Sequence, residues 1–345
     1  MSSYVFMETK TQNYRPSRLA DIIGQDEVRE YLKIKIDASK TGGKPVGHTL
    51  FLGPSGAGKT TLAQALSNEL GADYVEIFAP TMKDPQMLVR TLVNLKPGAV
   101  VFVDEIHALP PRTQEVLYTA LEDGEIRGYN RVTNMNYSLS VAPFTMIGAT
   151  THEGRLNEPL RKRFPNAVRL RPYSVEELAL LIGFASVKQF GLQLSKEVAL
   201  RLAGVSQGTP RVARNLLRCA VEVAQSVRMP FSLELVDKTL RYEELDPVIG
   251  LNRQQRRYLM VLATEGSMGA KGLATMLDEE IETIEFAVEP FLMQEVTLPT
   301  TDGKVSGTLV RRTTRGREIT PLGMQYLAMC QNLQTEGWFL GETFV

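Results

Sequence analysis

The sequence lacks the features that several classes of protein require. It has two cysteines among 345 residues, Cys219 and Cys330, which are too few for a disulfide framework and lack metal-ligand spacing. We expect both to be small buried groups in a reducing compartment. No apolar run approaches the length of about 18 residues that a membrane-spanning helix needs. Residues 1–13 have no basic segment followed by an apolar one, so no secretory signal is expected. These absences predict a soluble, cytoplasmic protein with no membrane partner.

An excess of charge of one sign is also absent. Lysine plus arginine and aspartate plus glutamate number 39 each, so the formal net charge is zero. Any case for nucleic-acid binding must therefore come from local clusters of basic residues. Hydrophobic residues make up 43% and charged residues 23%, which is ordinary for a globular protein. A chain of 345 residues exceeds one compact core, so we expect two or three domains.

The most informative stretch is a glycine-rich loop at residues 53–60. It follows a short apolar run at residues 49–52, typical of a buried strand, and precedes apolar residues at helical spacing. A strand, then GxxxxGK[ST], then a helix indicates a phosphate-binding loop, because backbone N–H groups and the helix N-terminus converge on an anion. The residues predicted to hold the nucleotide here are Gly53, Pro54, Gly56, Ala57, Gly58, Lys59, Thr60 and Thr61. The alternative, an ordinary glycine-rich turn before a helix, leaves the flanking pattern unexplained.

Two acidic residues extend this prediction to ATP hydrolysis. Asp104 and Glu105 end a continuous apolar run at residues 99–103, which is typical of a strand buried in a parallel sheet. Ligands of open α/β sheets bind at the carboxyl ends of the strands. In such a site Lys59 contacts the β- and γ-phosphates of ATP, Thr60 and Asp104 hold Mg²⁺, and Glu105 polarises the attacking water. Two acids that merely end a strand at the surface are the alternative.

The chain divides into three predicted domains. Strands and helices alternate up to residue 172, so residues 1–172 are expected to form an N-terminal arm and an α/β domain with a parallel sheet. A hairpin with a polar tip is expected at residues 125–141, as a plain surface hairpin or a partner-binding one. Residues 173–247 are predicted to be all helical, beginning at a capping box formed by Ser174 and Glu177. Residues 247–250 are interpreted as a linker to a third domain at residues 248–345.

The third domain shows the order of a winged helix-turn-helix. Three short helices are followed by an extended section rich in Thr, Gly and Val. Lys304, Arg311, Arg312, Arg315 and Arg317 fall in this section, with no acidic residue between positions 303 and 317. We predict that Arg312, Arg315 and Arg317 contact DNA phosphates, which would provide affinity and salt dependence without sequence readout. A basic hairpin on a soluble surface is the alternative.

Taken together, these motifs resemble the RuvB family of bacterial Holliday-junction branch-migration motors, within the AAA+ class of ATPases. The resemblance runs from about residue 15 to residue 327, with its motifs in the family's order and spacing. They are Arg15-Pro16, Ile23-Gly24-Gln25, residues 53–63, Asp104-Glu105-Ile106-His107, residues 147–151, residues 159–164, residues 208–211, Glu289-Pro290-Phe291-Leu292 and residues 312–317. The resemblance implies an AAA+ P-loop ATPase domain, an all-α lid domain and a C-terminal winged-helix domain.

The resemblance also implies roles that the residues alone do not assign. Ile22 and Ile23 would pack near the adenine beside Arg15, and Thr151 would be the sensor-1 hydroxyl near the γ-phosphate. Arg163 would be the arginine finger that a subunit offers to its neighbour's ATP, which implies the family's homohexameric ring. Arg211, preceded by Pro210, would be the sensor-2 residue on the lid. The implied activity is ATP-driven movement of duplex DNA at four-way junctions in recombination and DNA repair.

Four features depart from the family's pattern. His152-Glu153 stands where the family usually has an arginine after the two threonines, and Ser55 and Ala57 stand where it has proline and leucine. The hairpin at residues 125–141, which in the family docks on the junction-binding protein RuvA, has a different sequence. Extra residues precede Arg312. The chain is thus identified as a divergent member, which works with a RuvA-like protein, with a different partner or with none.

Two other functions are weighed against a junction motor. A clamp-loader or helicase-loader subunit would share the ATPase motifs, but such loaders generally end in a helical collar and lack a winged domain. A DNA-bound scaffold that binds nucleotide without turnover would not need the hydrolytic residues. Lys59, Asp104, Glu105, Thr151 and Arg163 are all present, which argues against a scaffold.

Overall fold

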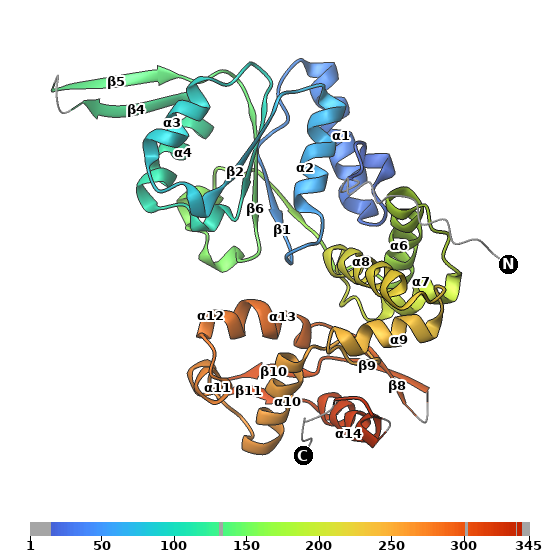
Figure 1. Ribbon diagram of the computed structural model, residues 1–345. Coiled ribbons are helices and arrows are strands. Elements are labelled where there is room, and N and C mark those ends of the chain that lie inside the picture. Colours follow the sequence, from blue (N-terminus) through green and yellow to red (C-terminus); the bar gives the residue numbers. More distant parts are fainter. Residues whose placement is uncertain (1–14, 131–133, 301–302, 336, 340–345) are drawn as a thin grey trace. The chain divides into compact units, whose positions relative to one another are not determined.

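The computed structural model describes residues 15–130, 134–300, 303–335 and 337–339. The chain divides between Tyr173 and Ser174 into two compact units, each with its own core (Figure 1). The predicted fold class is confirmed in both units: a P-loop α/β domain comes first, followed by a helical lid and a winged-helix domain.

The first unit is built on a five-stranded parallel sheet in the order β2-β3-β6-β1-β7. The strands are β1 (Thr49–Leu52), β2 (Tyr74–Phe78), β3 (Val100–Asp104), β6 (Thr145–Thr150) and β7 (Asn166–Arg169). All four residues of β1, the first four of β3 and all six of β6 are buried. Buried strands of this kind give the continuous apolar runs seen in the sequence, because helices cover both faces of the sheet.

Helices cover the two faces in pairs (Figure 1). Those of this unit are α1 (Asp26–Gly42), α2 (Lys59–Leu70), α3 (Pro85–Val93), α4 (Pro111–Glu122) and the short α5 (Glu158–Arg161). Helices α1 and α2 share a core with Phe51 and Phe102, whereas α3 and α4 share one with Leu50, Val101 and Val103. Successive side chains of a strand point to opposite faces, so β1 and β3 serve both cores.

A hairpin extends away from this sheet, as expected for residues 125–141 (Figure 1). Its strands are β4 (Glu125–Asn130) and β5 (Met135–Ser140), paired antiparallel, and its tip at residues 131–133 lies outside the described residues. Ile126 at its base is buried in the α3–α4 core. Farther out, Tyr129 and Met135 expose more than half of their side chains, so the hairpin's outer part does not pack on its own unit.

The second unit begins with the helical lid. Its helices are α6 (Val175–Phe190), α7 (Lys196–Gly204), α8 (Pro210–Val227) and α9 (Leu233–Tyr242). The predicted capping box at the start of α6 is present, with Ser174 Oγ accepting from the Glu177 N–H and Glu177 Oε2 accepting from the Ser174 N–H. This reciprocal pair satisfies two N–H groups at the helix start, which is why α6 begins where the sequence indicates.

The winged-helix part follows in the same unit. It contains α10 (Arg253–Glu265), α11 (Ala270–Leu277), α12 (Ile281–Thr283), a π-helical turn (Ile284–Val288), α13 (Glu289–Leu292) and α14 (Pro321–Thr335). The sequence predicts one continuous helix over residues 281–294; the structure interrupts it with the π-helical turn. Pro290 lacks an N–H and its ring clashes with the carbonyl four residues earlier, which breaks the regular ladder there.

Two β-ribbons, not one, follow these helices. The first pairs β8 (Val296–Thr300) with β9 (Gly303–Gly307), and the second pairs β10 (Val310–Thr313) with β11 (Gly316–Ile319). The extra residues before Arg312 thus form a hairpin of their own. The second ribbon is tied to the helices by paired backbone bonds between Met268 and Arg317. It therefore belongs to the winged-helix core.

The segment interpreted as a linker, residues 247–250, is an ordered junction between lid and winged helix. The buried Asp246 carboxylate accepts backbone N–H groups from Val248, Ile249 and Leu251. Gly250 has φ of 77°, and a Cβ there would lie 2.0 Å from the Val205 carbonyl oxygen in the lid. Only glycine fits this contact, so the junction is held by close packing and internal hydrogen bonds.

Candidate nucleotide and DNA sites

The predicted phosphate-binding loop connects β1 to α2. Three of its glycines have positive φ: 149° at Gly53, 77° at Gly56 and 101° at Gly58. A Cβ at Gly53 would lie 2.8 Å from the Leu170 carbonyl oxygen, so the loop must pass β7 without a side chain there. Helix α2 begins with no side-chain cap and no acidic residue in its first turn. Its N-terminus is thus suited to an anionic ligand.

Lys59 and the two threonines after it form the first turn of α2. The Lys59 side chain is buried, and its ammonium group donates to the carbonyl oxygens of Gly53 and Pro54 at 2.9 and 3.0 Å. The charge is therefore held over the loop in which a phosphate would sit. Ala57 is buried against the core shared by α1 and α2, while Thr60 and Thr61 are half-buried.

The sheet order brings the hydrolytic residues to the same edge. β6 lies between β1 and β3, so Thr151, which follows β6, sits between the loop after β1 and the acids after β3. Asp104 is the last residue of β3, and its Oδ1 accepts the Glu105 N–H at 3.1 Å. The carboxyl ends of three neighbouring parallel strands thus gather Lys59, Asp104, Glu105 and Thr151, as the sequence predicts.

Glu105 is held directly by Thr151. Its carboxylate accepts the Thr151 hydroxyl at 3.1 Å and the Thr151 N–H at 3.3 Å. The backbone of Glu105 has φ of 49°, the left-handed region that is uncommon for a residue with a side chain. Strain of this kind concentrates at functional sites, where it fixes the direction of a side chain.

Two histidines, to which the sequence assigned no role, lie beside Glu105. His107 Nδ1 is 2.8 Å from the Thr150 hydroxyl and 3.4 Å from Glu105 Oε2, and the His152 ring packs edge-on against it. Burial lowers the pKa of His107, and Arg155 lowers it further although Glu105 opposes the shift. Burial and then His107 lower the pKa of His152. Both rings are therefore neutral near pH 7.

Arg163 lies two residues beyond α5, on the same unit. Its guanidinium donates to Pro159 O at 2.8 Å and to Glu122 Oε2 at 2.9 Å, and it lies over the Tyr118 ring at 4.9 Å. These contacts come from α4 and α5, not from the loop after β1. The structure therefore brings Arg163 together with Glu122 and Tyr118.

The N-terminal segment is fixed by Gln25, which belongs to one of the family motifs but was assigned no role from the sequence. Its buried side chain donates to Arg171 O at 2.6 Å and accepts the Arg171 N–H at 3.3 Å. Ile22 is buried in the core of α1 and α2, Ile23 is half-buried and Arg15 is exposed. The arrangement leaves Ile23 and Arg15 accessible, whereas Ile22 contributes mainly to packing.

The lid carries the other predicted nucleotide contacts. Pro210 is buried at the first position of α8, and Arg211 follows it with an exposed side chain. Proline suits this first position because its missing N–H would have no partner inside the helix. Arg211 is thus presented at the N-terminal end of the lid's longest helix.

The basic ribbon β10–β11 places its arginines in different environments. Arg312 and Arg317 lie directly opposite each other, and both bind the buried Glu289 carboxylate, at 2.6 and 2.8 Å. Arg317 also binds Glu285 at 2.7 Å and is only 12% exposed, whereas Arg312 is 56% exposed. Arg315 is exposed in the turn between the strands. Arg312 and Arg315 are therefore accessible to a ligand, and Arg317 is mostly internal.

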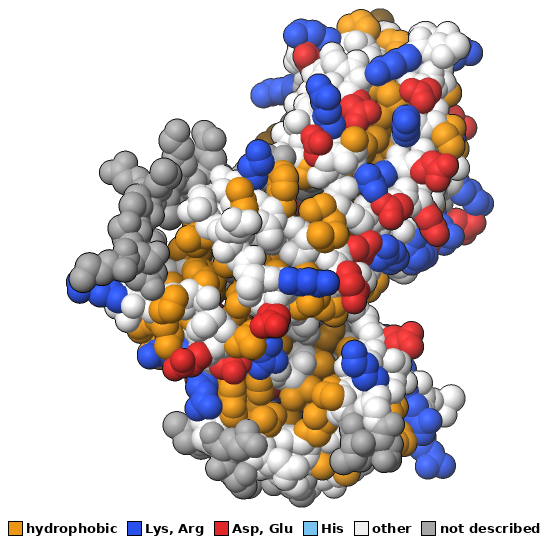
Figure 2. Space-filling model, turned by 90° about the vertical axis from the view of Figure 1, so that its right-hand side faces the viewer, with side chains coloured by type: hydrophobic (Ala, Val, Ile, Leu, Met, Phe, Trp, Pro, Cys, Tyr) orange, Lys and Arg blue, Asp and Glu red, His pale blue; other side chains and the backbone are white. Residues whose placement is uncertain are grey.

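Charges of both signs also meet on the rest of the surface. Figure 2 shows a face on which Lys and Arg are interspersed with Asp and Glu, with hydrophobic side chains between them. The mixed charges on this face produce no broad field of one sign. The predicted DNA contacts therefore rest on the local cluster of basic residues in β10–β11.

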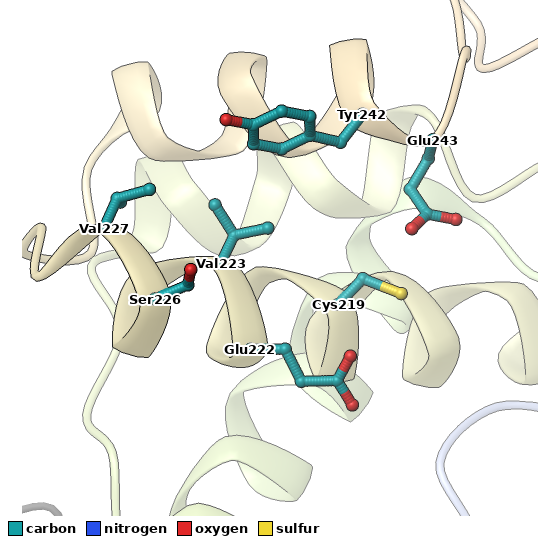
Figure 3. Close-up of a pocket in the computed structure, with 7 residues that line it drawn as sticks. All are labelled: Cys219, Glu222, Val223, Ser226, Val227, Tyr242 and Glu243. Atoms are coloured by element: carbon teal, nitrogen blue, oxygen red, sulfur yellow. The ribbon is translucent and has the colours of Figure 1, made fainter.

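A groove of about 320 Å³ lies on the lid and is lined by none of the predicted site residues. Figure 3 shows its lining from α8 and the end of α9. The lining residues are Cys219, Glu222, Val223, Ser226, Val227, Tyr242 and Glu243. Burial, with the Glu243 carboxylate, raises the pKa of the Cys219 thiol to about 11, so this thiol is not activated as a nucleophile.

No helix among the described residues is long and apolar enough to cross a membrane. No cluster of three or more His, Cys, Asp or Glu side chains within residues 15–130, 134–300, 303–335 and 337–339 could hold a metal ion.

Sequence comparisons identify the parts of the chain. The family model "Holliday junction DNA helicase RuvB P-loop domain" matches residues 14–170, and "RuvB C-terminal winged helix domain" matches residues 248–328. A RuvB subunit of the Holliday junction branch migration complex from Synechococcus sp. is 38% identical over 93% of this chain and 84% of its own length. The corresponding subunit from Granulibacter bethesdensis is 39% identical over 91% and 86%.

Solved structures agree with the sequence comparisons. The Thermotoga maritima RuvB Holliday junction branch migration motor superimposes with a TM-score of 0.78 and 31% sequence identity, covering 91% of this chain and 98% of that one. The structural likeness thus spans the P-loop domain, the lid and the winged helix together. The chain therefore belongs to the RuvB family of Holliday-junction branch-migration ATPases.

Proposed function

We propose that this chain hydrolyses MgATP at a site completed by the next subunit of a ring, and that the winged helix grips the duplex being moved. The observation that carries the proposal is the bond between Thr151 and Glu105 beside the phosphate-binding loop. It joins a group able to sense the γ-phosphate to a group able to polarise water. A scaffold or a binding module has no need of that link.

The chain's own residues account for the steps at one nucleotide. Loop N–H groups and Lys59 hold the phosphates, and a bound γ-phosphate competes with Glu105 for the Thr151 hydroxyl. Glu105, released from that hydroxyl, accepts a proton from the attacking water. Arg15, Ile22, Ile23, Pro210 and Arg211 are proposed to contact the nucleotide from the N-terminal segment and the lid.

Magnesium fits the donor set of this site. Mg²⁺ is usually held by one or two protein oxygens, with phosphate and water oxygens completing its octahedron. Thr60 and Asp104 supply a hydroxyl and a carboxylate of that kind. When bound, the metal neutralises charge on the phosphates.

Arg163 is proposed to act on the neighbouring subunit's ATP. Within its own unit it is anchored to Glu122, Pro159 and Tyr118. An arginine held in this way has lost part of its rotamer freedom before it meets a phosphate, which favours action as a finger. Catalysis in trans requires a ring, and a homohexamer is the state proposed from the family.

The proposed DNA contacts are Arg312 and Arg315, and Arg317 is proposed to support Arg312 through the Glu289 carboxylate that both arginines bind. The proposed protein partner is a RuvA-like junction-binding protein, docked on β4–β5. Exposed Tyr129 and Met135 on that hairpin support a partner there, because large apolar side chains on a projecting element favour burial against another protein.

The experiment that tests this function is ATP-dependent dissociation of a synthetic four-way junction, with and without a RuvA-type protein. The account predicts ATP-dependent strand separation in the native protein and none in Glu105→Gln. Full ATPase activity without junction movement in either condition would favour a loader. Loss of stimulation on truncating the hairpin at residues 129–136, with DNA-independent ATPase retained, is expected if β4–β5 binds the partner.

A further inference from the structure

One buried carboxylate organises the basic ribbon of the winged helix. Glu289, the first residue of α13, is 1% exposed. Its Oε1 accepts the Tyr258 hydroxyl at 3.0 Å and Arg317 Nε at 2.8 Å, and its Oε2 accepts Arg312 Nη2 at 2.6 Å. A buried carboxylate with three such donors is well satisfied, and two of the bonds are charge-assisted.

The ribbon needs this carboxylate because of its register. Arg312 on β10 and Arg317 on β11 are directly opposite each other, and like charges in that position repel. Glu289 lies between them and binds both. Glu285 accepts a further charge-assisted bond from Arg317, at 2.7 Å. Arg317, the inner arginine, thus binds two carboxylates of the protein.

Arg312, the outer arginine of the pair, has one guanidinium nitrogen bound to the protein and much of its side chain exposed to solvent. Arg312 binds Glu289 through Nη2 while more than half of its side chain remains exposed. Ordering an arginine costs side-chain rotamer entropy, and a planar guanidinium already fixed by one bond loses less of it on binding a phosphate. The opposite face of the ribbon differs, because Arg311 there pairs with Glu318, whose side chain is 25% exposed.

We propose that Glu289 is a positioning residue, which holds the Arg312 guanidinium in the orientation that receives a DNA phosphate, with Arg317 as the internal brace. This inference rests on the proposed DNA contact of the ribbon and refines it. Arg312 and Arg315 make the phosphate contacts, and Arg317 makes none. Burial and the Glu289 carboxylate raise the pKa of Tyr258, so its hydroxyl remains a donor to Glu289 across the working pH range.

The test measures the affinity of the full-length protein for a fluorescent duplex over a series of KCl concentrations. Each phosphate contact contributes about 0.9 to the slope of log K against log salt. Arg312→Gln is expected to reduce that slope by about 0.9. Glu289→Gln is expected to reduce it equally, and the double variant no further than either single one. Glu318→Gln is the matched control: it removes a carboxylate charge that pairs with Arg311 on the other face of the ribbon and should leave the slope unchanged.

The outcomes distinguish failure of the proposed DNA contact of Arg312 from failure of the positioning role of Glu289. If Arg312→Gln leaves both slope and affinity unchanged, the proposed DNA contact of Arg312 is wrong. If Arg312→Gln acts as expected but Glu289→Gln binds DNA as tightly as the native protein, or more tightly, the positioning role is wrong. Circular dichroism confirms folding in each case. Should Glu289→Gln fail to fold, Glu289→Asp replaces it, because its shorter side chain cannot reach both guanidinium groups, and the same outcomes decide.

Discussion

At the scale of single residues, we propose that the bond between Glu105 and Thr151 links nucleotide sensing to water activation. The Thr151 hydroxyl has one proton, so it cannot donate to the Glu105 carboxylate and to a phosphate oxygen at once. In the proposed mechanism, binding of ATP therefore changes the partner of Thr151 and frees Glu105. Neutral His107, itself bonded to the Thr150 hydroxyl, leaves room for that movement without holding the carboxylate by charge.

Glu105→Gln is expected to retain ATP binding and to lower kcat by about 10²- to 10⁴-fold, because an amide cannot accept the proton of the attacking water. Nucleotide affinity by fluorescence titration and phosphate release measure the two effects separately. Turnover near the native rate would contradict the assignment of Glu105 as the base.

Gly53→Ala is expected to weaken ATP binding and to destabilise the first unit by about 1–3 kcal/mol. The added Cβ would lie 2.8 Å from the Leu170 carbonyl oxygen, at a backbone φ of 149° that side chains rarely adopt. Gly154→Ala is the control, since nothing lies within 4 Å of a Cβ there. Equal melting temperatures and ATP affinities in the two variants would contradict this account of the loop.

Sequence patterns predicted the residues of the candidate sites themselves, but not the buried residues that hold the surrounding structure in place. Lys59, Asp104 and Glu105 could be assigned because a motif and a strand end define them along the chain. Gln25 and Glu289 stand in motifs that carry the family resemblance, but their roles could not be assigned because their partners lie 146 and 28 residues away in the sequence. Arg317 has the same charge as Arg312, so only the fold distinguishes the internal arginine from the exposed one.

At the scale of elements, a histidine between two strands is expected to make the stability of the first unit depend on pH. His48 precedes β1, and its Nδ1 accepts the Met146 N–H of β6 at 3.0 Å. Burial lowers the pKa of His48, as it does for His107 and His152, the only other histidines of the chain. Each ring is neutral in the folded protein at pH values where the unfolded chain would be protonated.

The free energy of unfolding is therefore expected to fall as the pH drops below about 6.5, the ordinary histidine value, and to stop falling below the lowered pKa values of the fold. Above that value both states are neutral and these groups have no effect. Urea unfolding at pH 7.5, 6.5 and 5.5 measures this change in the free energy of unfolding. His48→Gln should show a shallower pH dependence; identical dependence in this variant and the native protein would rule out a contribution from His48.

Elements with a strong local signal were predicted well, and those set by distant contacts were not. The structure confirms three predicted elements: the phosphate loop, the strand before Asp104 and the capped start of α6. The π-helical turn, the division into two ribbons and helix α14 were not anticipated. The ribbons lie in one continuous stretch rich in Thr, Val and Gly, and the second ribbon is fixed by its pairing with Met268, which is distant in the sequence.

At the scale of the whole molecule, the ordered junction between lid and winged helix suggests how ATP turnover reaches DNA. Gln207 of the lid donates to Gly250 O at 2.6 Å and to Gln255 of α10 at 3.0 Å. The buried Arg256 donates to the carbonyl oxygens of Glu244 and Leu251. Because these hydrogen bonds hold the junction in one arrangement, we expect a movement of the lid to move the winged helix with it.

Gly250→Ala is expected to destabilise the second unit and to reduce the number of junctions moved per ATP hydrolysed. Gly266→Ala is its control, because both glycines have φ of 77° but nothing lies within 4 Å of a Cβ at Gly266. Both variants should lose about 1 kcal/mol or more through backbone strain. Only Gly250→Ala should also lose coupling, measured as junction dissociation per phosphate released; equal coupling in the two would contradict a rigid junction.

The central claim is that each active site is shared between two subunits, with Lys59 and Glu105 from one and Arg163 from the next. Mixing two inactive variants tests it most directly. Lys59→Ala and Arg163→Ala proteins should each lack ATPase activity, and mixed rings should regain part of it, because some interfaces then pair an intact loop with an intact finger. Absence of activity at every mixing ratio, with mixed rings verified by native mass spectrometry, would contradict the shared site.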